Sequence, residues 1–207
     1  MSYYTYFSKQ ARKPSGLFGR FFMKKLFEKG NMELNTHVYE TLAFGKNDNI
    51  LEIGFGPGLF MKKIADSLTD GFIEGVDFSE TMVNIAKKRN RSHIKIGKVK
   101  IQSGDFNNVS YAANSFERVF TVNTIYFWQN PSETASKIFE ILKPGGKVVV
   151  GYHSKEDMEN SPLNKDVFKY YATEDVEELF TNANFKDVKT ITKKIADKSC
   201  YCCIATK

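Results

Sequence analysis

Residues 49–58 read NILEIGFGPG, a short apolar run that leads into a glycine-rich turn. A continuous apolar run of this length is typical of a strand that is buried on both faces. Pro57 suits the first position of a helix, and a helical pattern continues from there to about Leu68. Glycine lets the backbone turn sharply and approach a ligand, while the helix N-terminus presents unpaired N–H groups to an anion. The stretch therefore predicts a strand–loop–helix unit that binds a ligand.

The alternation of strand and helix patterns continues along the chain. Further strands are expected at residues 72–77, 99–103, 118–122 and 147–152, and helices at 80–91 (capped by Ser79), 132–142 and 174–182. Pro and Gly in residues 143–146 should end the second of these helices, and residues 153–171 are expected to be polar and irregular. The last two strands, 188–194 and 200–206, should pair antiparallel through a short loop around Asp197.

These elements predict an α/β fold, because strands separated by helices form a parallel sheet covered on both faces. We expect a doubly wound, Rossmann-like sheet of seven strands, mostly parallel with an antiparallel last strand, plus an N-terminal helical cap. The cap is assigned to residues 1–45 and the main domain to residues 46–207. Ligands of such sheets bind beyond the carboxyl ends of the strands.

The basic character of the chain belongs to the N-terminal arm. Residues 1–30 contain seven cations against Glu28 alone, which accounts for the whole formal charge of +6; the cations are Lys9, Arg12, Lys13, Arg20, Lys24, Lys25 and Lys29. We interpret the arm as a lid that closes the pocket and whose cations favour an anionic acceptor. Three other interpretations stay open: a helix on a membrane surface, an arm that grips RNA, and a plain structural cap.

The composition sets further bounds. No apolar run approaches the roughly 18 residues that a membrane span needs, and the N-terminus lacks the apolar segment of a signal peptide. The cysteines, Cys200, Cys202 and Cys203, are too close together for a disulfide framework and are expected as small residues on the last strand. We therefore expect a cytoplasmic protein, and nothing in the sequence points to a metal.

The spacing of the glycines narrows the choice of ligand. A dinucleotide-binding loop has the pattern G-x-G-x-x-G, whereas Gly54, Gly56 and Gly58 give G-x-G-x-G, with Leu59 at the position of the third dinucleotide glycine. Glu52 also lies two residues before the first glycine. Both features disfavour NAD, and no Gly-Lys-Ser/Thr follows to form a phosphate-binding P-loop.

The E-x-G-x-G-x-G pattern after the first strand resembles motif I of the class I S-adenosylmethionine-dependent methyltransferases. The rest of the chain, from residue 47 to 207, continues the resemblance, with Asp77 ending the second strand, Ser103-Gly104-Asp105-Phe106 after the third and Leu142-Lys143-Pro144-Gly145-Gly146 before the fifth. The resemblance implies S-adenosylmethionine as cofactor, with Asp77 on the ribose, Asp105 and Phe106 at the adenine, and Asn123 by the methionine part. The cofactor-binding residues it implies are Glu52, Gly54, Phe55, Gly56, Gly58, Asp77, Phe78, Met82, Gly104, Asp105, Phe106 and Asn123.

The segment NTIYFW at residues 123–128 is the candidate reacting face, because it follows the fourth strand at the ligand end of the sheet. We expect Asn123, Tyr126 and His153 as catalytic residues: Tyr126 as a hydrogen-bonding partner of the acceptor and His153 as a general base. Phe127 and Trp128 either face the sulfonium or pack beneath the loop. Methylases of exocyclic base nitrogens usually carry D/N-P-P-Y/F here, and the absence of both prolines argues against a nucleobase acceptor.

The sequence thus predicts a methyltransferase that acts on a small-molecule acceptor by in-line methyl transfer, for which positioning can supply much of the acceleration. Nucleic acid is not expected as a partner, and the oligomeric state is left open. The alternatives are a non-catalytic cofactor-binding module, an RNA methyltransferase and a nicotinamide-dependent oxidoreductase.

Overall fold

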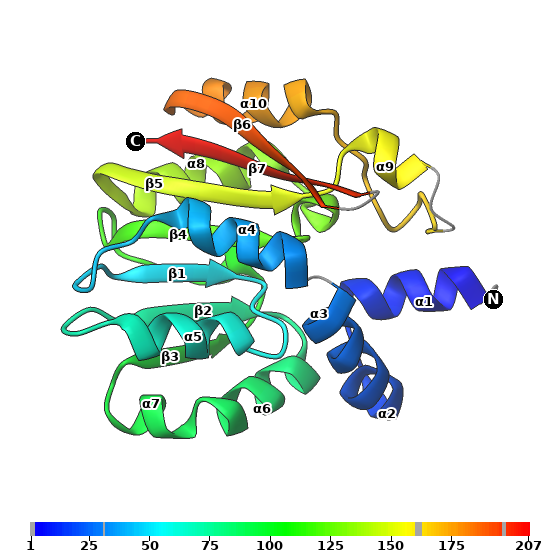
Figure 1. Ribbon diagram of the computed structural model, residues 1–207, viewed down its shortest axis with the longest axis horizontal. Helices are drawn as coiled ribbons and strands as arrows, with labels where there is room; N and C mark the ends of the chain where they lie inside the picture. Colours follow the sequence, from blue (N-terminus) through cyan, green and yellow to red (C-terminus); the bar gives the residue numbers. More distant parts are fainter. Residues whose placement is uncertain (1–2, 31, 160–162, 196–197) are drawn as a thin grey trace.

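The computed structural model describes residues 3–30, 32–159, 163–195 and 198–207, and it has one central sheet with helices on both faces (Figure 1). The sheet has seven strands in the order β3-β2-β1-β4-β5-β7-β6. Strands β1 to β5 pair parallel, and β7 runs antiparallel to both β5 and β6. The strands are β1 (Ile50–Ile53), β2 (Ile73–Asp77), β3 (Val99–Ser103), β4 (Phe116–Val122), β5 (Leu142–Tyr152), β6 (Lys186–Ile195) and β7 (Lys198–Thr206). The predicted fold class is confirmed.

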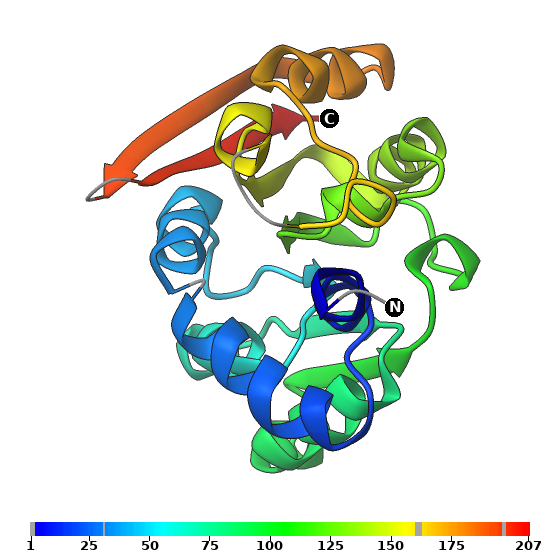
Figure 2. The same ribbon diagram turned by 90° about the vertical axis from the view of Figure 1, so that its right-hand side faces the viewer.

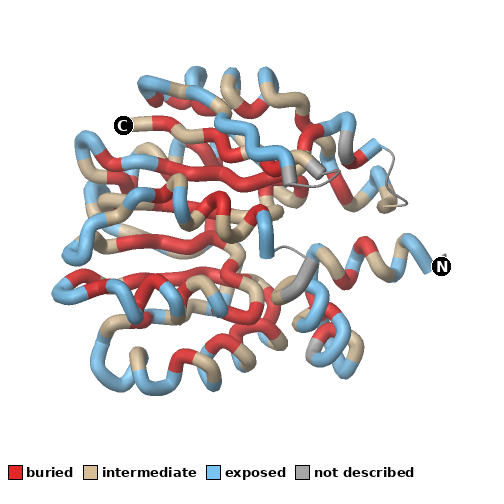
Figure 3. The backbone as a smooth tube through the Cα atoms, in the orientation of Figure 1, coloured by how far each residue is buried: buried red, intermediate tan, exposed pale blue. Residues whose placement is uncertain are grey.

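Two apolar clusters, one on each face, hold the sheet between its helices, and the central strands are buried along their length (Figure 3). One cluster joins the sheet to α4 (Met32–Leu42), α5 (Leu59–Ser67) and α6 (Glu80–Arg89). The other joins it to α8 (Pro131–Ile141) and α10 (Thr173–Asn182). Burial of both faces explains why the central strands are continuous apolar runs.

The remaining helices lie at the ends of the sheet. They are α1 (Tyr3–Arg12), α2 (Gly16–Phe18), η1 (Gly19–Met23), α3 (Lys24–Gly30), α7 (Arg91–Lys95), η2 (Phe106–Asn108), η3 (Ile125–Phe127) and α9 (Lys155–Glu159). The arm segment from α1 to α3 lies beyond the arrowheads of the parallel strands in Figure 1. Figure 2 looks onto this end and shows the arm in front of the sheet.

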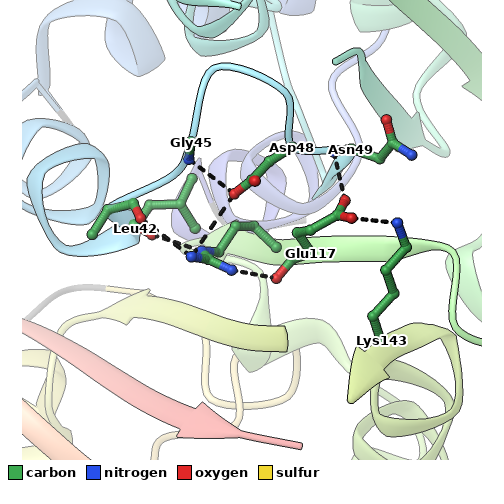
Figure 4. Close-up of polar contacts among 8 residues, drawn as sticks. Leu42, Gly45, Asp48, Asn49, Glu117 and Lys143 are labelled. Atoms are coloured by element: carbon green, nitrogen blue, oxygen red, sulfur yellow. Dashed lines mark hydrogen bonds and ion pairs between the residues drawn. The ribbon is translucent and has the colours of Figure 1, made fainter. Parts of the chain in front are cut away.

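The opposite end of the sheet is tied to the base of the arm by a polar network (Figure 4). Asp48 accepts a hydrogen bond from the backbone N of Gly45 at 2.9 Å, and Arg118 donates to the carbonyl of Leu42 at 3.2 Å. Glu117 accepts from the backbone N of Asn49 at 2.7 Å and pairs with Lys143. Burial raises the pKa of Glu117, but the hydrogen bonds from Lys143 and Asn49 outweigh it, so its pKa lies below the usual value. The network fixes the loop between α4 and β1.

Several expected boundaries were wrong. The fifth strand begins at Leu142 instead of Lys147, because Gly145 N and Gly146 O bond the backbone of Lys207 and draw the Pro-Gly-Gly segment into the sheet. The first main-domain helix begins at Leu59 and not at Pro57, since Gly58 precedes it with a φ of 67°. The helix expected at 80–91 ends at Arg89, and α7 follows.

Other expectations on the second half have mixed outcomes. The segment expected to be irregular, residues 153–171, contains the helix α9, which is too short and polar to show a periodic pattern. The antiparallel pairing of the last two strands is confirmed, whereas the loop expected around Asp197 lies outside the described residues. Cys200, Cys202 and Cys203 are buried on β7, where burial raises the pKa of the last two thiols to about 12.

Candidate active site

A cavity of about 460 Å³ opens at the carboxyl ends of the parallel strands, between the sheet and the arm. It is lined by the glycine loop after β1, the ends of β2 and β4, the loops after β3 and β5, and residues of the arm. Thirteen of the fourteen predicted site residues line it: Glu52, Gly54, Phe55, Gly56, Asp77, Phe78, Met82, Gly104, Asp105, Phe106, Asn123, Tyr126 and His153. Gly58 is not among the lining residues. The topology therefore brings segments 100 residues apart in the chain to one cavity.

The glycine loop needs its glycines for close packing. Gly54 has a φ of 73°, and a Cβ there would lie 2.5 Å from Cγ2 of Thr124. A Cβ at Gly58 would lie 2.7 Å from Cβ of Ala86 on α6, and the Gly58 carbonyl accepts a hydrogen bond from Asn90 at 3.0 Å. Gly58 thus serves helix packing, whereas Gly54 lets the loop pass beside the β4 end.

Both carboxylate oxygens of Asp77 accept hydrogen bonds from the backbone of the cavity wall. Its Oδ2 accepts from the backbone N of Gly56 and its Oδ1 from that of Ser79, both at 2.8 Å. Burial raises its pKa from 3.8 to about 6, although the two backbone N–H groups act in the opposite direction. The expected cap of α6 by Ser79 is also confirmed, since its hydroxyl accepts from the backbone N of Met82 at 3.3 Å.

Glu52 is a second buried carboxylate beside Asp77. Its side chain is 6% exposed, and its Oε2 has no hydrogen-bond partner among the described residues. Burial, and then the charge of Asp77, raise its pKa well above the usual value. A buried carboxylate without a partner is costly, and a cationic ligand group in the cavity would relieve that cost. The cavity therefore fits a ligand that carries both hydroxyls and a positive charge.

The loop after β3 forms another wall of the cavity. Asp105 accepts from the backbone N of Asn107 at 3.0 Å, and Phe106 is 6% exposed. Lys137 of α8 donates to the carbonyls of Phe106, Asn107 and Val109 at 2.7, 3.0 and 2.6 Å, and lies 4.9 Å from the centre of the Phe106 ring. Sequence reasoning missed Lys137, because a lysine on a helix gives no sign of the loop it will hold.

The predicted catalytic residues form one hydrogen-bonded group. Asn123 has a φ of 56°, a left-handed conformation that asparagine tolerates. The Tyr126 hydroxyl accepts from the backbone N of His153 at 2.5 Å and lies 3.3 Å from Asn123 Oδ1 and 3.2 Å from the His153 carbonyl, so it links the ends of β4 and β5. Nδ1 of His153 lies 3.2 Å from the Ser199 carbonyl. A carbonyl only accepts, so Nδ1 carries the proton of the neutral ring and Nε2 the lone pair.

Phe127 and Trp128 both pack and line the cavity. Phe127 contacts the ring of Phe168 with a centroid distance of 4.7 Å, and the Trp128 Nε1 donates to Thr124 Oγ1 at 3.3 Å. The two alternatives considered for these rings are therefore compatible.

Arm residues complete the cavity, and sequence reasoning named none of them as site residues. Phe7, Ala11, Arg12, Pro14, Leu26 and Phe27 line it. The arm is held there by polar contacts: the Ser79 hydroxyl donates to the Pro14 carbonyl at 2.6 Å, and Arg89 pairs with Glu28 while donating to the Pro57 carbonyl at 2.5 Å. The two contacts join the arm to the segments next to Asp77 and the glycine loop.

Comparisons with known proteins identify the family of the chain. A family profile described as a methyltransferase domain matches residues 51–150. The uncharacterized methyltransferase YdaC of Bacillus subtilis is 29% identical over 86% of this chain and 93% of its own length. Phosphoethanolamine N-methyltransferase 2 of Caenorhabditis elegans is 30% identical over 73% of this chain, which spans only 32% of that relative.

Among solved structures, Haemonchus contortus phosphoethanolamine N-methyltransferase 2 has a TM-score of 0.78 at 18% identity, over 96% of this chain and 59% of its own. At that identity the likeness confirms the fold. Taken with the matched family profile, the chain belongs to the class I S-adenosylmethionine-dependent methyltransferases. It is an enzyme that uses S-adenosylmethionine as its cofactor, which decides against the nicotinamide-dependent and the non-catalytic alternatives. No helix among the described residues is long and apolar enough to cross a membrane.

Proposed function

We propose that the enzyme methylates a small molecule held between the cofactor and the N-terminal arm. The observation that carries this proposal is that the arm and the glycine loop line the same cavity of about 460 Å³, to which the arm contributes Phe7, Arg12 and Leu26. Cavities of this size are typical of small-ligand sites. A cavity roofed by the arm favours a small acceptor over a folded RNA, and the Caenorhabditis elegans relative bears the name of a small phosphate-containing acceptor.

The cofactor half of the cavity is assigned to the two buried carboxylates and the loop after β3. Asp77 would accept the ribose hydroxyls, Glu52 would face the positive charge of the methionine part, and Phe106 with Asp105 would hold the adenine. The unpartnered Oε2 of Glu52 supports this assignment, because a cationic group of the cofactor would offset the cost of burying this carboxylate. When bound, S-adenosylmethionine supplies an electrophilic methyl group on a sulfonium.

The acceptor half is assigned to the group that contains Tyr126 and His153. Tyr126 positions the backbone of His153 and the side chain of Asn123 through its hydroxyl. His153, with its Nε2 lone pair, would take a proton from the acceptor. Arg12 is the one lysine or arginine among the described residues that line the cavity, so it would pair with an anionic group of the acceptor.

The arm would act as the lid of this site, since its contacts with Ser79 and Arg89 connect it to the cofactor-binding segments. Deletion of residues 1–30 tests the lid. We expect weaker binding of S-adenosylhomocysteine in calorimetry and loss of turnover, with the sheet retained in circular dichroism. Unchanged affinity and turnover would contradict the lid.

The acceptor class is tested by a panel of small phosphate- and carboxylate-bearing amines and alcohols, with transfer RNA as the alternative acceptor, using cofactor labelled in the methyl group. Arg12→Gln should raise KM for an anionic acceptor about tenfold and leave kcat nearly unchanged, because it removes a charge-assisted contact that forms before the reaction. Methylation of RNA alone would contradict the proposal.

A further inference from the structure

The arm exposes an unusual amount of apolar surface. Of the twelve large apolar side chains that the described residues expose, eight belong to the arm and α4: Tyr3, Tyr4, Tyr6, Leu17, Phe21, Phe22, Leu26 and Met32. Leu17 and Phe21 are 74% and 66% exposed. The arm and α4 make up about a fifth of the chain, so this surface is concentrated at one end of the molecule.

The aromatic side chains of α1 and of the α2–η1 segment form one patch. Ring contacts link α1 to the α2–η1 segment in an unbroken series of centroid distances between 4.8 and 6.4 Å, through Tyr4, Tyr3, Phe7, Phe22, Phe18 and Tyr6. With the neighbouring Leu17 and Phe21, we call these rings the aromatic patch. A contiguous exposed apolar patch of this kind marks an interaction surface.

The orientation of α1 is inverted relative to an ordinary surface helix. Its buried residues are polar: Ser8 is 0% and Gln10 is 7% exposed, and Ser8 accepts a hydrogen bond from the backbone N of Asn164 at 2.9 Å. Its exposed residues include Tyr3, Tyr4 and Tyr6. Helices normally turn their apolar face to the core. The polar anchor therefore fixes the helix with its three tyrosines exposed, while the half-buried Phe7 reaches the cavity.

The arm that carries the aromatic patch also carries exposed cations. Lys9, Lys13 and Lys25 are exposed and do not line the cavity, and none of them forms an ion pair with a described carboxylate. Glu28, the single acidic residue of the first thirty, forms an ion pair with Arg89 of α6. The charge of the arm is thus left for an external anion.

We propose that the aromatic patch and its cations dock the enzyme on the surface of an anionic lipid bilayer. Aromatic and aliphatic side chains enter the headgroup and acyl boundary while lysine and arginine contact anionic headgroups. A second copy of the chain is disfavoured as the occupant, because two strongly basic arms would repel each other. RNA is disfavoured because the rings pack against one another, which leaves few ring faces on which bases could stack. The exposed Leu17 offers no stacking surface to a base.

On a regular α-helix, Lys25 and Lys29 would share one arc with Phe18, Phe21 and Phe22, and such imperfect amphipathicity argues against a membrane role. Residues 16–30 form one continuous helical run, but its middle part, η1, is a π-helix, so the angular positions of Phe18 and Lys25 differ from those on a regular α-helix. Long lysine side chains also reach headgroups from positions beside inserted rings.

The test is flotation of the whole chain with vesicles of phosphatidylcholine alone and with vesicles that also contain about 30% phosphatidylglycerol. We expect binding to the anionic vesicles that weakens as salt is raised and little binding to the neutral ones. The double variant Leu17→Ser, Phe21→Ser should bind about tenfold more weakly. Lys9→Gln and Lys25→Gln should each weaken binding about fivefold.

The matched control is Ile96→Ser, because Ile96 is 65% exposed but lies after α7, away from the arm. It should bind vesicles like the unaltered chain. None of the substituted residues lines the cavity, so every variant should bind S-adenosylhomocysteine normally, which also shows that it is folded. Equal vesicle binding by the double variant and the unaltered protein would overturn the proposal. So would failure to bind anionic vesicles, whether or not the arm then binds RNA or self-associates.

Discussion

The pKa of Asp77 gives a sharp prediction about the binding of S-adenosylmethionine. Burial raises this pKa to about 6, so lowering the pH from 7 to 5 protonates the side chain. Only the ionised carboxylate can accept from the two backbone N–H groups and from both ribose hydroxyls. One unit below the pKa about a tenth of the protein is ionised, so the Kd should rise about tenfold between pH 7 and pH 5.

The assay is fluorescence titration, for which the sequence offers one tryptophan, Trp128, on the cavity wall. The α-amino group of the cofactor stays protonated in this range, so the change reports on the protein. Asp77→Asn should bind about 10- to 100-fold more weakly at pH 7, since hydrogen bonds to a charged group are lost, and its profile should have no midpoint near pH 6. Asp70→Asn is the matched control, an exposed carboxylate outside the cavity, and should behave like the unaltered protein.

A midpoint near pH 6 that persists in Asp77→Asn would refute the assignment, as would a flat profile in the unaltered chain. The ligand-free protein provides an independent check. The folded state binds this proton more tightly than the unfolded chain, so the contribution of Asp77 to stability is present below pH 3.8 and is lost as the pH rises to about 6. The size of that loss is about 3 kcal/mol. Asp77→Asn should remove this part of the pH dependence from denaturant unfolding curves.

Three further substitutions have definite expected outcomes. Glu52→Gln should raise the melting temperature of the ligand-free protein, because it removes the cost of burying an ionisable carboxyl group. The same substitution should weaken cofactor binding in calorimetry about tenfold. A lower melting temperature would contradict the raised pKa of Glu52. Gly54→Ala should cost about 1–3 kcal/mol in urea unfolding, and adding Thr124→Ser should recover only the steric part; full recovery would show that the positive φ is not limiting. Tyr126→Phe should cost about 1–3 kcal/mol in the same assay by leaving the His153 N–H unpaired, and should lower kcat, whereas unchanged stability would contradict the link.

The sequence alone determined the strand–helix alternation and the glycine loop, because both depend on residues that are neighbours in the chain. Apolar runs, the Ser79 cap and the glycines at 54–58 act locally, and the absence of a helix before the last strand was enough to predict its antiparallel pairing. Resemblance to a known family then identified eleven residues that line one cavity, and the position of Tyr126 and His153 after predicted strands identified two more, without any knowledge of strand order.

Tertiary structure decided the features that depend on distant partners. The Pro-Gly-Gly of residues 144–146 reads as a break, yet it joins the sheet because Lys207 pairs with it. Tyr126 reads as an acceptor contact, yet its hydroxyl holds the His153 backbone. The orientation of α1, with Ser8 inside and its tyrosines outside, follows from a hydrogen bond to Asn164 more than 150 residues away. Local patterns fix which elements form, whereas hydrogen bonds and packing between remote segments fix which faces they present.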